Sequence, residues 1–514
     1  MLDSWKHLQN GSDIRGVALE GIEGEPVNLT PEIAKTIAMS FAAWLSEKPD
    51  LATKRLRISV GRDSRLSGPV LLDAVVSGLS ETGCDVTDVG IASTPAMFMS
   101  TVIPGYEFDG AIMLTASHLP FNRNGLKFFT PEGGLEKQDI TAILELASAG
   151  AKNTAGTPGE VSSMDFISVY ASHLVANIRK EAADPIDFDH PLNGLHILVD
   201  AGNGAGGFFA DKVLRPLGAD TDGSQFLDPD GSFPNHIPNP EDAKAMASIQ
   251  HAVLTNKADL GIIFDTDVDR AGAVDKNGKE VNRNRIIALM AAIVLSEHPG
   301  TTIVTDSITS DELKIFIEDK LGGTHHRFKR GYKNVINEAI RLNSIGRETH
   351  LAIETSGHGA LKENYFLDDG AYLIAKILIQ VARLKREGRT IDMLLSDLAE
   401  PIEAKEFRLG ILEENFKTCG LQIIDKLTEA ALQEPGWIPA SENYEGIRIS
   451  VDPAHGNGWF LLRLSLHDPL MPLNIESRQS GGVKLIAARV YELLSGMSGL
   501  NLSALEKILS KLSL

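Results

Sequence analysis

The chain has 514 residues, of which 43% are hydrophobic and 23% charged, a balance typical of globular proteins and unlike that of disordered chains, collagens or coiled coils. Its length indicates about three to five domains. The 69 acidic and 49 basic residues give a formal net charge of −20 at pH 7. This charge disfavours nucleic acid and anionic membranes as partners, so any anionic ligand requires a local cluster of cations.

The cysteines and the N-terminus indicate a cellular compartment. Cys84 and Cys419 fit no metal or redox spacing, which favours a reducing compartment over a disulfide-built secreted protein. Residues 1–16 are too polar for a secretion signal and lack the composition of a transit peptide. The longest apolar run, Ile286–Leu295, is too short to cross a bilayer and predicts a core helix. We therefore expect a soluble, cytoplasmic protein.

A short apolar strand, a polar or glycine-containing loop and a helical stretch recur along the chain. The six strands predicted from this pattern are Leu56–Val60, Ala111–Leu114, Leu195–Val199, Asp259–Phe264, Thr302–Val304 and His350–Ile353. Strands that alternate with helices predict α/β domains with parallel sheets covered on both faces. Ligands of such sheets bind beyond the carboxyl ends of the strands, so the loops that follow these strands are the candidate sites.

Three breaks in the pattern suggest domain boundaries. The first lies in the weakly patterned stretch 149–159, the second at 282–285 and the third near Pro401, after which longer helices and isolated strands such as Trp459–Leu464 predict an α+β domain. The predicted domains are 1–155, 156–283, 284–400 and 401–514, the first three being α/β domains with a similar pattern.

The sharpest motif is Asp265-Thr266-Asp267-Val268-Asp269-Arg270, which directly follows a predicted buried strand. Alternate residues of an extended segment share a face, so the three carboxylates would crowd together and require a cation. Oxygen ligands favour a hard divalent ion, Mg²⁺ before Ca²⁺. The segment is not an EF-hand loop, because Arg270 and Lys276 stand where glycine and glutamate are needed. A solvated acidic loop is the alternative.

A second strand is followed by Thr115-Ala116-Ser117-His118-Leu119-Pro120. The small residues leave the Ser117 hydroxyl accessible, but a hydroxyl needs a base or a metal ion to act as a nucleophile. The hexapeptide alone favours a simpler interpretation, a loop serine that caps the next turn. Lys127, in Asn124-Gly125-Leu126-Lys127, is either a phosphate contact or proton-transfer group or a solvated surface lysine.

The segment Glu354-Thr355-Ser356-Gly357-His358 also follows a strand. Its Glu and Ser can bind adjacent sugar hydroxyls, while a turn with a helix cap explains it equally well. The remaining loops contain Arg and Lys residues that are candidates for binding phosphate, although we expect most of them to have a structural role or to face solvent. They are Arg15, Arg62, Arg65, Lys329, Arg330 and Lys333 around Gly331, Arg463 beside Ser465, and Arg478 beside Ser480.

A glycine-rich turn admits another reading. Gly202-Asn203-Gly204-Ala205-Gly206-Gly207 follows a predicted strand and fits the dinucleotide-binding pattern, with Asp220 near the spacing of a ribose-binding acid. Two observations disfavour a dinucleotide site. Asp200 would place a negative charge against the pyrophosphate, and the aspartate motif at 265–270 would have no function. A turn that packs a helix tightly on a strand accounts for the glycines better.

Taken together, and in the order in which they occur along the chain, the loops after the predicted strands resemble those of the α-D-phosphohexomutase family (phosphoglucomutase/phosphomannomutase). The matching motifs are the phosphoserine loop at 115–120, the metal loop at 265–270, the sugar loop at 354–358 and a C-terminal Arg-x-Ser phosphate loop at 463–465. Shorter matches at 11–16, 60–63, 124–127 and 233–240 extend the resemblance over nearly the whole chain.

The resemblance implies three related α/β domains with mixed, mainly parallel sheets and a C-terminal α+β domain, arranged around a central cleft. It also implies a Mg²⁺-dependent mutase that moves phosphate between the 1- and 6-positions of glucose or mannose through a phosphoserine and a hexose 1,6-bisphosphate. It implies hexose phosphates as partners, no nucleic acid or membrane, and a monomer or homodimer. The implied catalytic residues are Ser117, Lys127, Arg15, Arg270 and His118; the metal ligands are Ser117, Asp265, Asp267 and Asp269; the substrate-binding residues are Glu354, Ser356, His358, Lys333, Gly331, Arg463, Ser465 and His467.

Two departures from the family pattern keep other functions open. Leu119 stands where asparagine is usual, and 463–469 reads Arg-Leu-Ser-Leu-His-Asp-Pro, which places His467 where a hydroxyl is usual. The alternatives are a phosphoglucosamine mutase, a catalytically weak relative that binds sugar phosphates, and an NAD-dependent oxidoreductase. The intact Ser117 and aspartate motif argue against a simple binding protein, which needs no phosphoryl acceptor.

Overall fold

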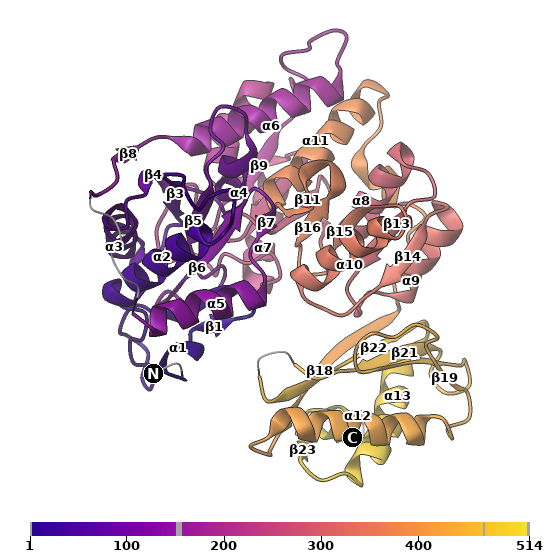
Figure 1. The fold of residues 1–514 in the computed structure, drawn as a ribbon. Helices are drawn as coiled ribbons and strands as arrows, with labels where there is room; N and C mark the ends of the chain where they lie inside the picture. Colours follow the sequence, from indigo (N-terminus) through magenta and orange to yellow (C-terminus); the bar gives the residue numbers. More distant parts are fainter. Residues whose placement is uncertain (1–2, 151–156, 466–467, 511–514) are drawn as a thin grey trace. The chain divides into compact units, whose positions relative to one another are not determined.

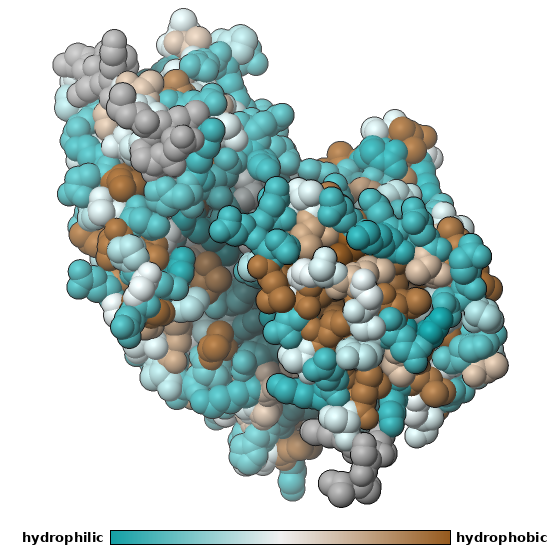
Figure 2. Space-filling view, turned by 90° about the horizontal axis from the view of Figure 1, so that it is seen from below, coloured by the Kyte–Doolittle hydropathy of each residue, from teal (hydrophilic) through white to brown (hydrophobic). Residues whose placement is uncertain are grey.

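The computed structural model describes residues 3–150, 157–465 and 468–510. The chain forms two compact units, Met1–Ile286 with Ser356–Leu394, and Ile287–Thr355 with Leu395–Leu514. Within the described ranges, every helix is too short or too polar to span a bilayer. Hydrophilic residues predominate on the face shown in Figure 2, with apolar residues between them.

The first unit begins with an eight-stranded mixed sheet in the order β1-β2-β6-β5-β3-β4-β8, with β7 paired to β6 (Figure 1). Its strands are β1 Gln9–Asn10, β2 Asp13–Val17, β3 Arg57–Arg62, β4 Asp85–Ile91, β5 Gly110–Leu114, β6 Arg123–Thr130, β7 Gly133–Gly134 and β8 Val161–Ser163. β3 pairs in parallel with β4 and β5, whereas β6 runs antiparallel to β2 and β5. The carboxyl ends of β3 and β5 therefore lie side by side.

Helices pack against this sheet. They are α1 Asp3–Lys6, α2 Pro31–Ser46, α3 Gly68–Glu81, α4 Thr94–Val102 and α5 Lys137–Ser148. α2, α3 and α5 share one apolar core with the strands, in which Phe41, Val75 and Ile143 are fully buried. α2 begins where Thr30 Oγ1 accepts a hydrogen bond from Ile33 N and proline occupies the first turn, both common features of helix starts.

A second, four-stranded sheet in the first unit has the order β12-β11-β10-β9. Its strands are β9 Ile197–Asp200, β10 Leu260–Phe264, β11 Ala271–Asp275 and β12 Glu280–Val281; its helical segments are α6 Phe166–Ala182, η1 Phe209–Leu214, η2 Arg215–Leu217 and α7 Ala243–Asn256. β9 and β10 are parallel and the other two pairs antiparallel. Every residue of β10 is buried, so the aspartate motif begins directly at the end of a core strand.

The glycine-rich turn after β9 is explained by close packing. A β-carbon on Gly204 would lie 2.7 Å from Thr266 O, and one on Gly207 would lie 2.0 Å from Leu227 O. At the end of β9, the Asp200 carboxylate accepts hydrogen bonds from His236 Nε2 at 3.0 Å. The glycines thus bring this turn against β10, as the sequence favoured, and a dinucleotide site is not needed to account for them.

The first unit is completed by the segment after Ser356. β16 Gly359–Leu361 pairs antiparallel with β17 Leu367–Asp368, around the short helix η4 Lys362–Asn364. Helix α11 Gly370–Arg386 follows and packs on α6. Asp369 caps it by accepting from Tyr372 N (2.8 Å) and also accepts from the Tyr170 hydroxyl of α6.

The second unit contains three parallel strands in the order β14-β13-β15. The elements here are α8 Asn284–Glu297, β13 Thr302–Thr305, α9 Asp311–Ile315, η3 Phe316–Lys320, β14 Thr324–Arg327, α10 Tyr332–Ser344 and β15 Thr349–Ile353. The short helix η5 Ile391–Leu395 belongs to the first unit except for its last residue. Residues 286–291 of α8 are fully buried, which confirms the predicted core helix.

The C-terminal part of the second unit is a six-stranded antiparallel sheet in the order β19-β20-β21-β22-β18-β23. Its elements are β18 Glu403–Ile411, α12 Phe416–Ala431, β19 Trp437–Pro439, β20 Ile447–Val451, β21 Gly458–Leu462, β22 Leu470–Ser477, α13 Gly482–Ser495, β23 Leu500–Asn501 and α14 Ser503–Ser510. Apolar residues of the helices and strands share one core. The predicted α+β character is confirmed.

The strands predicted from the sequence are all present. Each of the six α/β strands and the C-terminal strand at 459–464 lies within two residues of its predicted ends. The sheets are mixed, because antiparallel strands such as β2, β6 and β11 flank the parallel ones. The three predicted boundaries between the four domains stay predictions.

Candidate active site

The loop after β5 presents Ser117 to the aspartate motif. Ser117 has a φ of +51°, in the left-handed region, and its side chain is almost fully buried. Its Oγ donates a hydrogen bond to Asp265 Oδ2 (3.1 Å) and accepts one from Arg270 Nη2 (3.1 Å). The structure therefore brings together two motifs that lie 148 residues apart in the sequence.

The loop after β10 gathers the carboxylates of Asp265, Asp267 and Asp269. One oxygen from each lies within 4.8 Å of the others, and all three residues are buried. Burial and the repulsion of Asp269 raise the pKa of Asp265 well above its usual value, although Arg270 opposes the shift. Such crowding of acids indicates a site that gains stability from a cation.

The residues present fit a hard divalent ion. Oδ1 of Asp267 and Oδ1 of Asp269 are buried and accept no hydrogen bond from any described residue. Unsatisfied buried carboxylate oxygens are costly, and oxygen-only ligands are those that Mg²⁺ and Ca²⁺ take. The acidic cluster can therefore hold a metal ion close to the Ser117 hydroxyl.

Cationic and hydroxyl groups meet the other carboxylate oxygens. Lys127 Nζ, from β6, lies 3.0 Å from Asp267 Oδ2 and 2.5 Å from Asp269 Oδ2. Thr94, at the start of α4, donates its hydroxyl to Asp267 Oδ2 (2.5 Å). Although burial opposes it, Lys127 holds the pKa of Asp269 below its usual value. Lys127 is thus not the solvated surface lysine that the sequence also allowed.

Arg270 links the aspartate motif to both Ser117 and His118. Its Nε and Nη2 contact Asp265 Oδ2 at 3.1 and 3.0 Å, and Nη2 donates to His118 Nδ1 at 2.6 Å. Burial and the charges of Arg270 and Arg15 lower the pKa of His118 to about 2. The imidazole is therefore neutral at pH 7 and, because Nδ1 accepts, carries its proton on Nε2.

His358 and Arg15 complete the cluster in the first unit. His358 Nδ1 lies 2.5 Å from Asp368 Oδ2, at the end of β17. Burial opposes the charged ring, but Asp368 and Asp269 raise the pKa of His358 to about 9, so it is a cation at pH 7. Arg15, on β2, pairs with Asp13 at 3.1 Å. Ser356 is also buried in this unit.

The other predicted substrate-binding residues belong to the second unit. Gly331, with a φ of +117°, precedes α10 and donates its N–H to Glu354 Oε1 (2.6 Å), while Lys333 lies in the first turn of that helix. Arg463 follows β21 and is 7% exposed. Ser465 Oγ accepts from Asp468 N (3.3 Å). His467 lies outside the described residues.

The structure adds polar groups that the sequence did not single out. Glu445 Oε1 accepts from the Ser307 hydroxyl and from Arg330 N (2.7 Å). Burial and the Glu354 carboxylate raise the pKa of Asp306, at the end of β13, to about 7. Thr94 likewise has a partner distant in sequence, Asp267, and Asp368 meets His358 only through the pairing of β16 with β17, so no local motif marked either residue.

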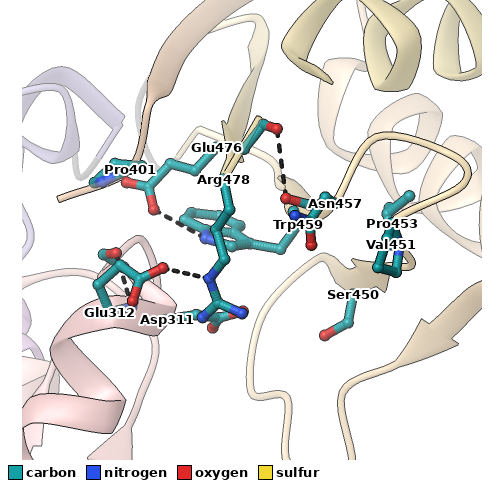
Figure 3. A pocket seen from close by; sticks show the side chains of 13 residues that line it. Asp311, Glu312, Pro401, Ser450, Val451, Pro453, Asn457, Trp459, Glu476 and Arg478 are labelled. Carbon is teal, nitrogen blue, oxygen red and sulfur yellow. Dashed lines mark hydrogen bonds and ion pairs between the residues drawn. The ribbon is translucent and has the colours of Figure 1, made fainter. Parts of the chain in front are cut away.

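A pocket of about 340 Å³ in the second unit is lined by Arg478, one of the candidate phosphate-binding cations, but by none of the residues that the family resemblance implies (Figure 3). Arg478 points across it toward Glu312, with which it forms an ion pair, and Trp459 Nε1 donates to Glu476 Oε2 (2.9 Å). Its walls come from the start of α9 and from the C-terminal sheet. The chemistry-bearing residues lie elsewhere, at the strand ends.

Comparison with known protein families gives three consecutive matches. Residues 6–154 match phosphoglucomutase/phosphomannomutase alpha/beta/alpha domain I, residues 169–278 match domain II, and residues 282–402 match domain III.

Similar proteins and solved structures agree with these family matches. The chain is 33% identical to a phosphoglucomutase/phosphomannomutase of Thermococcus kodakarensis over 90% of its length and 93% of the relative. It is 30% identical to a phosphomannomutase/phosphoglucomutase of Pseudomonas putida, over 87% of its length and 89% of the relative. A crystal structure of a phosphoglucomutase/phosphomannomutase family protein from Burkholderia thailandensis superposes with a TM-score of 0.76 at 27% identity, covering 96% of this chain and 98% of the other.

Proposed function

Because this chain belongs to the phosphoglucomutase/phosphomannomutase family, we propose that it reversibly moves a phosphoryl group between the 1- and 6-positions of glucose or mannose phosphate. The family resemblance predicted from the sequence is confirmed, and with it the class of enzyme, a phosphohexomutase. Neither a phosphoglucosamine mutase, a non-catalytic binding protein nor an oxidoreductase is favoured.

One observation carries the proposal: the Ser117 hydroxyl lies at 3.1 Å from both Asp265 Oδ2 and Arg270 Nη2. A phosphoryl group on this oxygen would meet the acidic cluster on one side and a fixed guanidinium on the other. Phosphoryl transfer depends on positioning and on compensation of charge, and this site supplies both.

We propose Mg²⁺ as the ion of the acidic cluster, held by Asp265, Asp267 and Asp269 together with the phosphorylated Ser117. When bound, it would neutralise charge on the phosphoryl group. Lys127, His358 and Arg270 are fixed cations of the chain that act in the same direction, and each is held by a carboxylate.

The proposed reaction has two balanced halves. In the first, the P–O bond to Ser117 breaks while a P–O bond to the free sugar hydroxyl forms, giving a hexose 1,6-bisphosphate. The sugar hydroxyl loses one proton and Ser117 Oγ gains one, so no net proton is consumed. Lys127 is the proposed proton-transfer group, and the neutral His118 is proposed to hold the Arg270 guanidinium beside Ser117. The second half returns the other phosphate of the bisphosphate to Ser117.

A mutase must hold its intermediate in two orientations, so it needs a site for the phosphate that is not reacting. We assign this phosphate to Arg463 and Ser465, with Gly331 and Lys333 beside it. Glu354 and Ser356, with His358, are the proposed contacts of the sugar hydroxyls. A hexose 1,6-bisphosphate is the expected activator, and a cytoplasmic location and a monomer or homodimer stay predictions.

The test is a coupled assay with glucose 1-phosphate, mannose 1-phosphate and glucosamine 1-phosphate, with Mg²⁺ and a trace of glucose 1,6-bisphosphate. We expect turnover of one or both of the first two, and a phosphate on the peptide containing Ser117 in mass spectra of the enzyme. A folded protein that turns over none of the three and gains no phosphate would refute the proposal. Turnover of glucosamine 1-phosphate alone would overturn the substrate assignment.

A further inference from the structure

We propose that Arg65 is a positioning residue that fixes the loop carrying Ser117, and that it acts on phosphoryl transfer through this loop rather than by binding phosphate. The inference rests on the proposed role of Ser117. The sequence grouped Arg65 with the candidate phosphate ligands, and the structure assigns it a different task.

The sheet brings the Arg65 loop to the Ser117 loop. β3 and β5 are parallel neighbours, and the last residue of one, Arg62, is in register with the last residue of the other, Leu114. The segments that follow these strands therefore leave the sheet side by side. Asp63 N donates to Leu114 O (3.0 Å), which continues the pairing one step beyond the strands.

The Arg65 guanidinium donates hydrogen bonds to main-chain carbonyl groups of the Ser117 loop. Nη2 donates to Ser117 O and to Leu119 O (2.6 Å), and Nη1 donates to Pro120 O (2.7 Å) and Arg123 O (3.0 Å). Four carbonyl groups over seven residues thus converge on one side chain.

The fifth N–H of the guanidinium, on Nε, makes no hydrogen bond to any described residue but is buried. Arg65 Nε lies 3.3 Å from Asp63 Oδ2, with which the side chain forms an ion pair, and the Arg65 side chain has no exposed surface. A guanidinium has five N–H donors. Four of them are used on main-chain carbonyl groups and the fifth is enclosed, so none is accessible to a phosphate.

Asp63 extends the support to Thr115, two residues before Ser117. Its Oδ2 accepts from the Thr115 hydroxyl (2.7 Å), and the same Thr115 oxygen accepts from Ser117 N (2.9 Å). Ser117 is thereby held at its N–H through Thr115 and at its carbonyl through Arg65. Both peptide groups that define its backbone conformation are fixed.

This support matters because Ser117 adopts a left-handed conformation. For a residue with a side chain, this conformation is energetically unfavourable. Hydrogen bonds to a charged group are stronger than those between neutral groups, so the four contacts of Arg65 can offset this cost. Without them, the loop would relax and the hydroxyl would leave its position beside Asp265 and Arg270.

A segment of the same unit shields Arg65 from solvent and substrate. The Phe233 ring lies 5.5 Å from the guanidinium. A β-carbon on Gly231 would lie 2.5 Å from Ser64 O and 2.7 Å from Arg65 Cα, so the glycine allows this segment to close tightly over the Arg65 loop. In contrast, Arg55, which precedes β3, is 52% exposed and pairs with Asp85 at 2.9 Å.

The test compares Arg65→Lys with Arg55→Lys in the full chain. Lysine keeps the charge but offers a single nitrogen, which cannot bridge four carbonyls. For Arg65→Lys we expect kcat for glucose 1-phosphate to fall about 100-fold, with KM changed less than about threefold. Phosphorylation of Ser117 by glucose 1,6-bisphosphate should slow in parallel, and hydrogen exchange should accelerate in the peptide 115–124. Arg55→Lys should leave all four measurements close to those of the wild type.

The outcomes separate the alternatives. A raised KM with unchanged kcat would mean that Arg65 binds phosphate, and wild-type behaviour of Arg65→Lys would mean that it positions nothing; either result overturns the inference. If Arg65→Lys fails to fold, Thr115→Val decides, because it removes only the hydroxyl that links Asp63 to Ser117 N and should lower kcat with little change in KM. If the wild type itself is not phosphorylated on Ser117, the proposed function fails first.

Discussion

Arg448 is predicted to be the main stabilising cation between the C-terminal sheet and the loop after β13. It is buried on β20, and its guanidinium lies 3.6 Å from the Trp459 ring. It donates to Ser307 O (2.9 Å), Thr309 O (3.1 Å) and Asp311 Oδ1 (2.9 Å). Arg448→Met keeps an unbranched apolar stem of similar reach and removes all three donors.

The expected loss of stability follows from these contacts. Removing one partner of a buried ion pair costs about 3–5 kcal/mol. Because Asp311 also accepts from Arg327 (2.9 Å), its carboxylate keeps one cation, and we expect the lower end of this range, about 3 kcal/mol. The control is Arg408→Met: Arg408 is 73% exposed and pairs with Glu406 at 3.0 Å, so its loss should cost less than about 1 kcal/mol.

Urea unfolding followed by tryptophan fluorescence measures both variants. Two of the four tryptophans, Trp437 and Trp459, lie in the second unit, so their part of the signal reports on the region that Arg448 supports. We expect a clear decrease of the unfolding midpoint for Arg448→Met and almost none for Arg408→Met. Equal midpoints for the two variants would refute the argument that Arg448 ties these segments together.

Further predictions concern the metal ion, pH and the distal phosphate. At 100 times its Kd, Mg²⁺ should stabilise the wild type by about 2.7 kcal/mol in thermal unfolding, and Asp267→Asn should lose this gain together with activity; an unchanged gain would contradict the assigned ligands. Burial raises the pKa of Glu476 to about 7. The folded state therefore holds this proton more tightly than the unfolded state, and stability should fall between pH 5 and 8 by up to about 3 kcal/mol. Glu476→Gln should remove that part of the pH dependence, whereas equal slopes for both proteins would count against it. Arg463→Gln should raise KM for glucose 1-phosphate more than about tenfold, and an unaltered KM would exclude Arg463 from the phosphate site.

The strands and the chemistry-bearing loops could be predicted because they depend on local signals. Short apolar runs marked β5 and β10, and the polar residues directly after them include Ser117 and Asp265. The crowding of three carboxylates follows from residue alternation alone. The family resemblance extended these signals to the glucose or mannose phosphates.

Partners that come from other strands could not be predicted. Arg65 was one of several loop cations in the sequence, and its task depends on the register of β3 against β5, which no local pattern encodes. The pairing of His358 with Asp368 depends in the same way on the β16–β17 turn. Lys127 remained ambiguous because a single lysine carries no sign of the carboxylates that surround it.

The positive φ of Ser117 has a consequence for the choice of amino acid at this position. Threonine offers an equivalent alcohol and would serve the chemistry of phosphate transfer equally well. Its additional methyl group, however, makes a positive φ a severe outlier for such a branched residue. The shape of the main chain thus selects the primary alcohol over the secondary one, independently of reactivity.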